Sequence, residues 1–240
     1  METELQRIYT EKLPESPSFE MILVEGGTFQ MGGDDKEAED DEQPIHLVQL
    51  SSFYIGKYPV TQGLYEAIMG VNPSEFKELN HPVENISWED AQEFISQLNQ
   101  KTGKRYRLPS EAEWEFAARG GIYSEGYLYA GSDRLKDVGW YRENNEPRGT
   151  KSVGQLLENE LGIHDLSGNV YEWCEDDYHD SYQEAPTDGS AWIDHPKRGQ
   201  SRVLRGGYWL DYARPCRVFS HDRYSPDIRY FSVGFRLVLP

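Results

Sequence analysis

Residues 106–115 read YRLPSEAEWE, and this stretch decides which fold the sequence predicts. Ser110 follows a proline and has a glutamate three residues later, a pairing in which the helix N-cap and the third helical residue satisfy each other's backbone N–H groups. The apolar residues between Trp114 and Ala118 then predict a short buried helix that ends before Gly120.

An arginine lies just ahead of this helix. Arg107 falls in a short strand-like run, and Glu111 and Glu113 are near it in sequence. A buried guanidinium group requires carboxylate partners, so we expect Arg107 to form a structural ion pair and not a functional site.

A longer helix is predicted upstream, over residues 87–101. Ser87 and Asp90 again form an N-cap and its partner three residues on. Apolar residues follow at spacings of three and four, which places them on one helical face: Ala91, Phe94, Ile95 and Leu98. A shorter helix is expected over residues 61–69.

Strand-like alternation precedes the helices. Residues 21–33 read MILVEGGTFQMGG and predict a hairpin around Gly26 and Gly27. Residues 1–20 are polar and contain proline, so we expect a loose N-terminal extension followed by one domain over residues 21–240. No repeat or linker divides the sequence, which favours a single α+β domain with much irregular structure.

Seven blocks in the same order resemble the signature blocks of the formylglycine-generating enzyme (sulfatase-modifying factor) family. They are 29–32 (FQMG), 58–61 (YPVT), 86–91 (ISWEDA), 106–115, 161–173 (LGIHDLSGNVYEW), 204–207 (LRGG) and 234–236 (GFR). The resemblance implies a C-type-lectin-like fold, with small twisted antiparallel sheets and two main helices.

The cysteines depart from the family's catalytic pattern. Relatives that oxidise a substrate cysteine carry two active-site cysteines shortly before the last block, and the matching places here are about Ala213 and Val218. Cys216 lies between them alone, and Cys174 is distant in sequence. A copper thiolate centre requires two soft ligands, so we expect no copper and no catalytic residue. The six histidines show no ligand spacing either.

The resemblance also implies a structural calcium ion. The matching ligands are the side chains of Asp165 and Glu172 and the carbonyls of Gly168 and Val170. Carboxylate and carbonyl oxygens suit this hard cation. The alternative is that Asn169 and Glu172 only hydrogen-bond the loop.

Residues 206–233, which we call the tail, contain no Lys, Glu, Gln or Met and are dense in aromatic residues, Arg and Asp. Such a composition is typical of a binding face. The tail resembles the variable region of diversity-generating-retroelement proteins, which use the same lectin-like fold. Those proteins vary Asn codons, and that variation cannot produce Lys, Glu, Gln, Met or Trp.

The resemblance implies a set of diversified ligand-binding positions in the tail. They are Tyr208, Leu210, Asp211, Tyr212, Pro215, Phe219, His221, Asp222, Tyr224, Ser225, Ile228, Tyr230, Phe231 and Ser232. Strand alternation would put Tyr230 and Ser232 on one face, so we do not expect every position to be exposed. The favoured function is non-catalytic ligand binding. The alternatives are a formylglycine-generating-type oxidoreductase and an undiversified binding or regulatory domain.

The net charge of the chain limits the classes of partner that it is expected to bind. The 240 residues carry a net charge of −18, which repels phosphate backbones and argues against nucleic acid. We expect a protein ligand, with carbohydrate as the alternative. No apolar segment resembles a signal peptide or a membrane span, so the chain as written predicts a soluble protein without membrane insertion. Display at a cell surface would require a leader that was removed.

Overall fold

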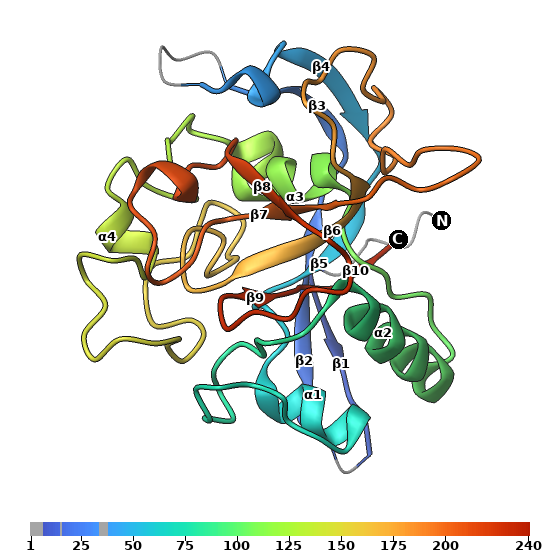
Figure 1. Ribbon diagram of the computed structural model, residues 1–240, viewed down its shortest axis with the longest axis vertical. Helices are drawn as coiled ribbons and strands as arrows, with labels where there is room; N and C mark the ends of the chain where they lie inside the picture. Colours follow the sequence, from blue (N-terminus) through green and yellow to red (C-terminus); the bar gives the residue numbers. More distant parts are fainter. Residues whose placement is uncertain (1–6, 15, 34–37) are drawn as a thin grey trace.

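The computed structural model describes residues 7–14, 16–33 and 38–240 (Figure 1). Within these ranges it has two four-stranded sheets, one two-stranded sheet and three helices of eight residues or more. Small sheets, few helices and long irregular connections confirm the predicted C-type-lectin-like α+β fold.

The first sheet joins the two ends of the chain. Its order is β1 (Ile8–Glu11), β2 (Phe19–Val24), β5 (Phe53–Gly56) and β10 (Val238–Leu239), and every pair is antiparallel. The predicted loose extension over residues 1–20 is therefore wrong for its described part, because β1 and the start of β2 are paired strands. Strand β1 has only four residues, which are too few for an alternating pattern to identify a strand in the sequence. Residues 1–6 and 15 lie outside the described ranges.

The hairpin predicted around Gly26 and Gly27 is also wrong. Strand β3 (Gly27–Met31) pairs with β4 (His46–Leu50), whereas β2 pairs with β1 and β5. At Gly26 the chain leaves one sheet for the other and passes close to a neighbouring backbone. A Cβ atom there would lie 2.6 Å from the carbonyl oxygen of Leu50.

The second four-stranded sheet has the order β8 (His221–Tyr224), β7 (Arg202–Arg205), β6 (Tyr171–Asp177) and β9 (Val233–Gly234). The β6–β9 pair is parallel, which corrects the expectation of purely antiparallel sheets. Strand β7 is buried along its whole length and β6 along nearly all of it, so the middle of this sheet lies in the interior, whereas the edge strand β8 is partly exposed.

The three predicted helices are confirmed as α1 (Gln62–Met69), α2 (Trp88–Thr102) and α3 (Glu111–Ala118). Ser87 and Ser110 accept the expected N-cap hydrogen bonds, each with a reciprocal bond from the N-cap N–H to the third helical residue. The remaining helical turns are short: η1 (Asp40–Glu42), η2 (Gly121–Tyr123), α4 (Leu135–Val138) and η3 (Arg214–Cys216).

Helix α3 is buried on its charged side as well as its apolar side. Glu113 accepts two hydrogen bonds from Arg107, at 2.6 and 2.7 Å, which confirms a structural ion pair and identifies its partner. Glu111 and Glu115 instead face Arg205 of β7, whose Nε lies 3.0 Å from a Glu111 oxygen. These pairs attach α3 to the second sheet.

Two large hydrophobic clusters form the interior. One surrounds Trp114 and Phe116 of α3, and the other surrounds Phe94 of α2 and Phe235. None of the helices in the described part of the chain is long and apolar enough to cross a bilayer.

Candidate functional site

The tail supplies both edge strands of the second sheet. After β7 the chain turns sharply at Gly206 and Gly207, whose φ values are +95° and +70°. A Cβ atom on Gly207 would lie 2.6 Å from Cys216 Sγ, so this turn requires glycine. Strand β8 then pairs with β7, and β9 pairs with β6 (red ribbon in Figure 1). The two tail loops are thus held at both ends by a buried sheet.

Five tail residues form what we call the aromatic cluster: Tyr208, Trp209, Tyr224, Tyr230 and Phe231. Tyr230 stacks on Phe231 with ring centroids 4.5 Å apart, and Trp209 lies 5.7 Å from Phe231. Tyr224 meets the edge of Tyr230 at 6.2 Å. Rings from both tail loops and from β8 therefore pack into one continuous group.

Two residues outside the tail complete the aromatic cluster. Phe76 lies 5.4 Å from Trp209, and Tyr171 of β6 lies 5.6 Å from Tyr208. Sequence reasoning missed both as site residues. The only signal for Tyr171 was its place in the block at residues 161–173, and Phe76 carried none, because its position in the fold depends on contacts far along the chain.

Most of the predicted ligand-binding positions reach the surface. Tyr212 is 62% exposed, Tyr230 is 42% exposed and Ile228 is 41% exposed, and Ser225 is also exposed. The half-buried positions are Tyr208, Leu210, Asp211, Pro215, Asp222, Tyr224 and Phe231, whereas His221 is half-buried as a residue but has a buried side chain. Partly exposed rings that already pack against one another are suited to contact a partner at low entropic cost.

Phe219 and Ser232 correct the predicted set, because both are buried. Phe219 belongs to the hydrophobic cluster around Trp114 and lies 4.5 Å from the Arg217 guanidinium. Ser232 is fully buried, and its carbonyl accepts the Tyr171 N–H at 2.8 Å. The predicted shared face of Tyr230 and Ser232 is wrong, since strand β9 begins only at Val233.

His221 also has an internal role. Its side chain is only 2% exposed, with Nδ1 2.7 Å from a Glu111 oxygen and Nε2 3.5 Å from Asp41. Burial alone would lower the pKa of this imidazole, but the charges of Glu111 and Asp41 outweigh burial and raise it to about 9. His221 is therefore an imidazolium in a buried ion network and does not offer a surface contact.

Two tail carboxylates lie against the aromatic cluster, and we call them the acidic pair: Asp211 and Asp222. Both lie near the Tyr171 hydroxyl. The Tyr208 N–H donates to Asp211 at 3.2 Å. Burial, assisted by the charge of Asp222, raises the pKa of Asp211 to about 6, and burial also raises the pKa of Asp222. No salt bridge to either carboxylate forms within the described ranges.

The two cysteines are free thiols in different hydrophobic clusters. Cys174 belongs to the cluster around Trp114, whereas Cys216 packs with Tyr129, Leu135 and other residues of a third cluster. Burial raises the pKa of both thiols well above the usual value, which disfavours the thiolate that binds metal. This arrangement does not fit a two-thiol copper centre.

The predicted calcium ligands do not fit the ion. Both oxygens of Glu172 are taken by the Arg236 guanidinium, at 2.7 and 2.8 Å, and one also accepts the Trp114 indole N–H. Asp165 accepts the Gly154 N–H, and burial raises its pKa. Among the described residues no group of three His, Cys, Asp or Glu side chains is arranged to hold a metal. The geometry favours hydrogen bonding within the loop.

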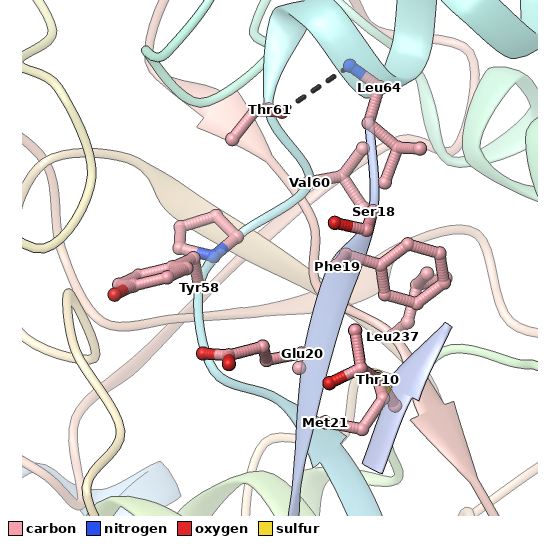
Figure 2. Close-up of a pocket in the computed structure, with 12 residues that line it drawn as sticks. Thr10, Ser18, Phe19, Glu20, Met21, Tyr58, Val60, Thr61, Leu64 and Leu237 are labelled. Carbon is pink, nitrogen blue, oxygen red and sulfur yellow. Dashed lines mark hydrogen bonds between the residues drawn. The ribbon is translucent and has the colours of Figure 1, made fainter. Parts of the chain in front are cut away.

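A separate cavity of about 280 Å³ lies between the first sheet and the segment leading into α1 (Figure 2). Phe19, Val60 and Leu64 provide much of its apolar lining. Its one carboxylate, Glu20, is paired with Lys57 at 2.9 Å. None of its lining residues belongs to the tail. A small apolar cavity without a free charged group is a weaker candidate than the tail surface.

Comparison with known proteins assigns the chain to a family. The chain matches the family described as the sulfatase-modifying factor enzyme 1-like domain over residues 9–240. Chaperone protein LppX of Paenibacillus barcinonensis is 34% identical, covering 84% of this chain and 82% of its own length. The formylglycine-generating enzyme of Streptomyces coelicolor is 36% identical, covering 90% of this chain and 87% of the enzyme.

Other relatives are longer or have solved structures. Serine/threonine-protein kinase pkn1 of Chlamydia caviae is 30% identical, and the match covers 94% of this chain but 39% of the kinase. The solved structure of Treponema denticola variable protein 1 superposes with a TM-score of 0.87 at 29% identity, covering 98% of this chain and 99% of that one. The chain belongs to the sulfatase-modifying factor enzyme 1-like family, the formylglycine-generating-enzyme-like domains.

Proposed function

We propose that this protein is a non-catalytic ligand-binding protein that recognises a protein partner through its tail. The observation that carries the proposal is the aromatic cluster, which is continuous and partly exposed: Tyr230 is exposed, Trp209 is buried and the other three rings are half-buried. Tyr212 and Ile228 add two further exposed apolar side chains to the tail. Tyrosine and tryptophan dominate the energetics of protein interfaces because they desolvate a large area with few rotatable bonds.

The support beneath the tail favours binding by a preformed surface. Arg205, Arg217 and Arg236 are all buried, and each is paired with a buried glutamate: Glu115, Glu42 and Glu172 respectively. Arg205 and Arg236 flank the tail in sequence, and Arg217 lies within it. A surface that is ordered before binding loses less entropy in the complex, which raises affinity.

An oxidoreductase of the formylglycine-generating type is the alternative, and the Streptomyces coelicolor relative supports it. The separate burial of Cys174 and Cys216 argues against that chemistry here. Copper-loaded protein should therefore consume no oxygen above background with a cysteine-containing peptide. Peptide-dependent oxygen uptake that is lost in Cys216→Ser would support the enzyme instead.

Diversification is a finer proposal, supported by the similarity to the Treponema denticola variable protein 1. It predicts a reverse transcriptase near the gene and a near-copy of the gene's 3′ end that differs only at adenines. If neither is found, the tail is an undiversified binding surface. Carbohydrate is the alternative ligand, and display at a cell surface would require a leader or an anchor.

The binding proposal is tested with a random peptide library displayed on phage and selected on the wild-type protein. We expect the enriched peptides to lose at least tenfold in affinity against Tyr212→Ala and Tyr230→Ala. The matched control is Tyr123→Ala, a comparably exposed tyrosine of η2 outside the tail. Failure to enrich any peptide, or equal binding to all three variants, would contradict the proposal.

A further inference from the structure

We infer that the tail surface receives a lysine or arginine side chain of a protein partner, with its charged end at Asp211 and Asp222 and its stem along Tyr208, Tyr224 and Tyr230. The inference rests on the proposed function and adds the chemistry of the partner. Three features carry it: the unfilled acceptors of the acidic pair, the direction of the basic side chains around it, and the rings beside it.

The acidic pair has few donors around it. The Tyr171 hydroxyl lies near both Asp211 and Asp222, but a phenol carries a single proton and can donate to only one acceptor at a time. The Tyr208 and Arg223 backbone N–H groups supply one further bond to each carboxylate, at 3.2 and 2.7 Å. Two carboxylates therefore retain acceptor capacity that these donors do not fill.

The nearby basic side chains are directed elsewhere. They make these contacts: Arg142 lies over the Tyr212 ring at 4.7 Å, Arg223 lies over the Tyr178 ring at 4.1 Å, and Arg229 bonds Asp90 at 2.6 Å. His221, next to Asp222 in sequence, is occupied by Glu111. The charges of His221 and Arg223 act on Asp222, but none of these side chains forms a salt bridge with the acidic pair.

The rings beside the acidic pair fit a basic side chain better than a bare ion. Tyr208 and Tyr224 lie close enough to be influenced by the charge of Asp211, and Tyr224 is also influenced by Asp222. Aromatic faces attract ammonium and guanidinium groups and pack against the methylene stem that carries them. A dehydrated metal ion would need several more oxygen ligands than two carboxylates provide.

The net charge of the whole chain also favours a basic partner. A net charge of −18 attracts a basic partner over a distance and accelerates its encounter with the surface. The acidic pair then provides a partly desolvated position where a single positive charge is favoured. Long-range attraction and local geometry select the same class of partner.

The inference is tested with two uncharged-backbone probes, N-acetyl-L-lysine methylamide and N-acetyl-L-norleucine methylamide. They have similar aliphatic stems, and only the lysine probe carries the ammonium group. We expect the lysine probe to shift the NMR amide signals of residues 208–224, and to bind at least tenfold more tightly than the norleucine probe.

Two variants with the same charge change localise the effect. Asp222→Asn should weaken the lysine probe at least tenfold. Asp227→Asn should leave its affinity unchanged within twofold, because the exposed Asp227 carboxylate bonds Ser225 outside the acidic pair. Circular dichroism verifies that both variants fold. Equal weakening by both variants would mean diffuse charge attraction and would overturn the inference.

The outcomes separate this inference from the proposed function. If phage-selected peptides depend on Tyr212 and Tyr230 but both small probes bind alike, the tail binds partners and the basic-residue inference is wrong. Selected peptides without enriched Lys or Arg would lead to the same conclusion. If no selected peptide depends on the tail, the proposed function itself fails.

Discussion

Arg236 and Glu172 form a bidentate ion pair in the interior, with Nη2 2.7 Å from Oε1 and Nε 2.8 Å from Oε2. Both side chains are fully buried. Arg236 comes from the GFR block and Glu172 from the block at residues 161–173, so two segments distant in sequence meet where the tail ends. The pair explains why the fold needs both residue types together, because each charge compensates the other for its burial.

The first prediction concerns this pair. Arg236→Met leaves the Glu172 charge buried without a cation, so it should lower the free energy of unfolding by about 3–5 kcal/mol. Urea denaturation at pH 7 measures the change. The control is Arg134→Met, which breaks an exposed pair with Asp137 and should cost less than about 1 kcal/mol. Equal losses in the two variants would contradict the assignment.

A second prediction follows for calcium. Because Arg236 and the Trp114 indole already occupy the Glu172 oxygens, neither EDTA nor millimolar calcium should move the melting temperature by more than about 2 °C. Differential scanning calorimetry provides the measurement. A calcium-dependent rise in melting temperature that disappears in Asp165→Asn would restore the ion that the family resemblance implies.

The third prediction concerns Asp211 and pH. Its pKa is about 6 in the fold against an ordinary value of 3.8, so the folded state holds more protons between these values and stability falls as pH rises through them. Asp211→Asn should therefore stabilise the protein by about 1–3 kcal/mol at pH 7.5. The neighbouring charge that raises the pKa of Asp211 is that of Asp222. The charges of His221 and Arg223 in turn act to lower the pKa of Asp222.

Urea denaturation at pH 5 and pH 7.5 tests this. The gain from Asp211→Asn should be largest at pH 7.5 and smaller at pH 5, where much of the wild-type carboxyl is already protonated. Asp227→Asn provides the control and should change neither value by more than about 0.5 kcal/mol, because its carboxylate is at the surface. Destabilisation by Asp211→Asn at pH 7.5 would show that the charge is compensated within the fold.

A fourth prediction concerns His221, whose pKa is raised from 6.5 to about 9. A histidine whose pKa is higher in the folded state stabilises the fold while it is protonated. This stabilisation is complete below the pKa of the unfolded state and is lost as pH rises through the pKa of the folded state, so it declines between about pH 6.5 and 9. His221→Gln should lower stability by about 2–3 kcal/mol at pH 6 and by much less at pH 9.5. Urea denaturation at the two pH values measures the difference. A loss that does not change with pH would show that the imidazole is neutral.

Local signals made the helices predictable. Ser87 and Ser110 each cap a helix through bonds to a residue three positions away, so the information lies within one turn. Strand pairing does not have this property. Residues of β2 pair with β5 some thirty positions later, and nothing near Gly26 indicates that β3 belongs to another sheet.

The candidate site was predictable in composition but not in detail. The aromatic and charged residues of the tail indicated a binding face, and Tyr212 and Tyr230 are exposed as expected. Phe219, His221 and Ser232 could not be separated from them, because these positions are buried by segments distant in sequence and not by strand alternation. The acidic pair could not be predicted either, because Tyr171, which lies beside it, belongs to strand β6 and is distant in sequence.

The most direct test of the central claim is hydrogen–deuterium exchange of the protein with and without a phage-selected peptide. We predict slowed exchange in the two tail loops, residues 208–220 and 225–232, and at Phe76 beside the aromatic cluster, with little change elsewhere. Protection confined to the cavity of Figure 2, around residues 18–21 and 58–64, would contradict the claim.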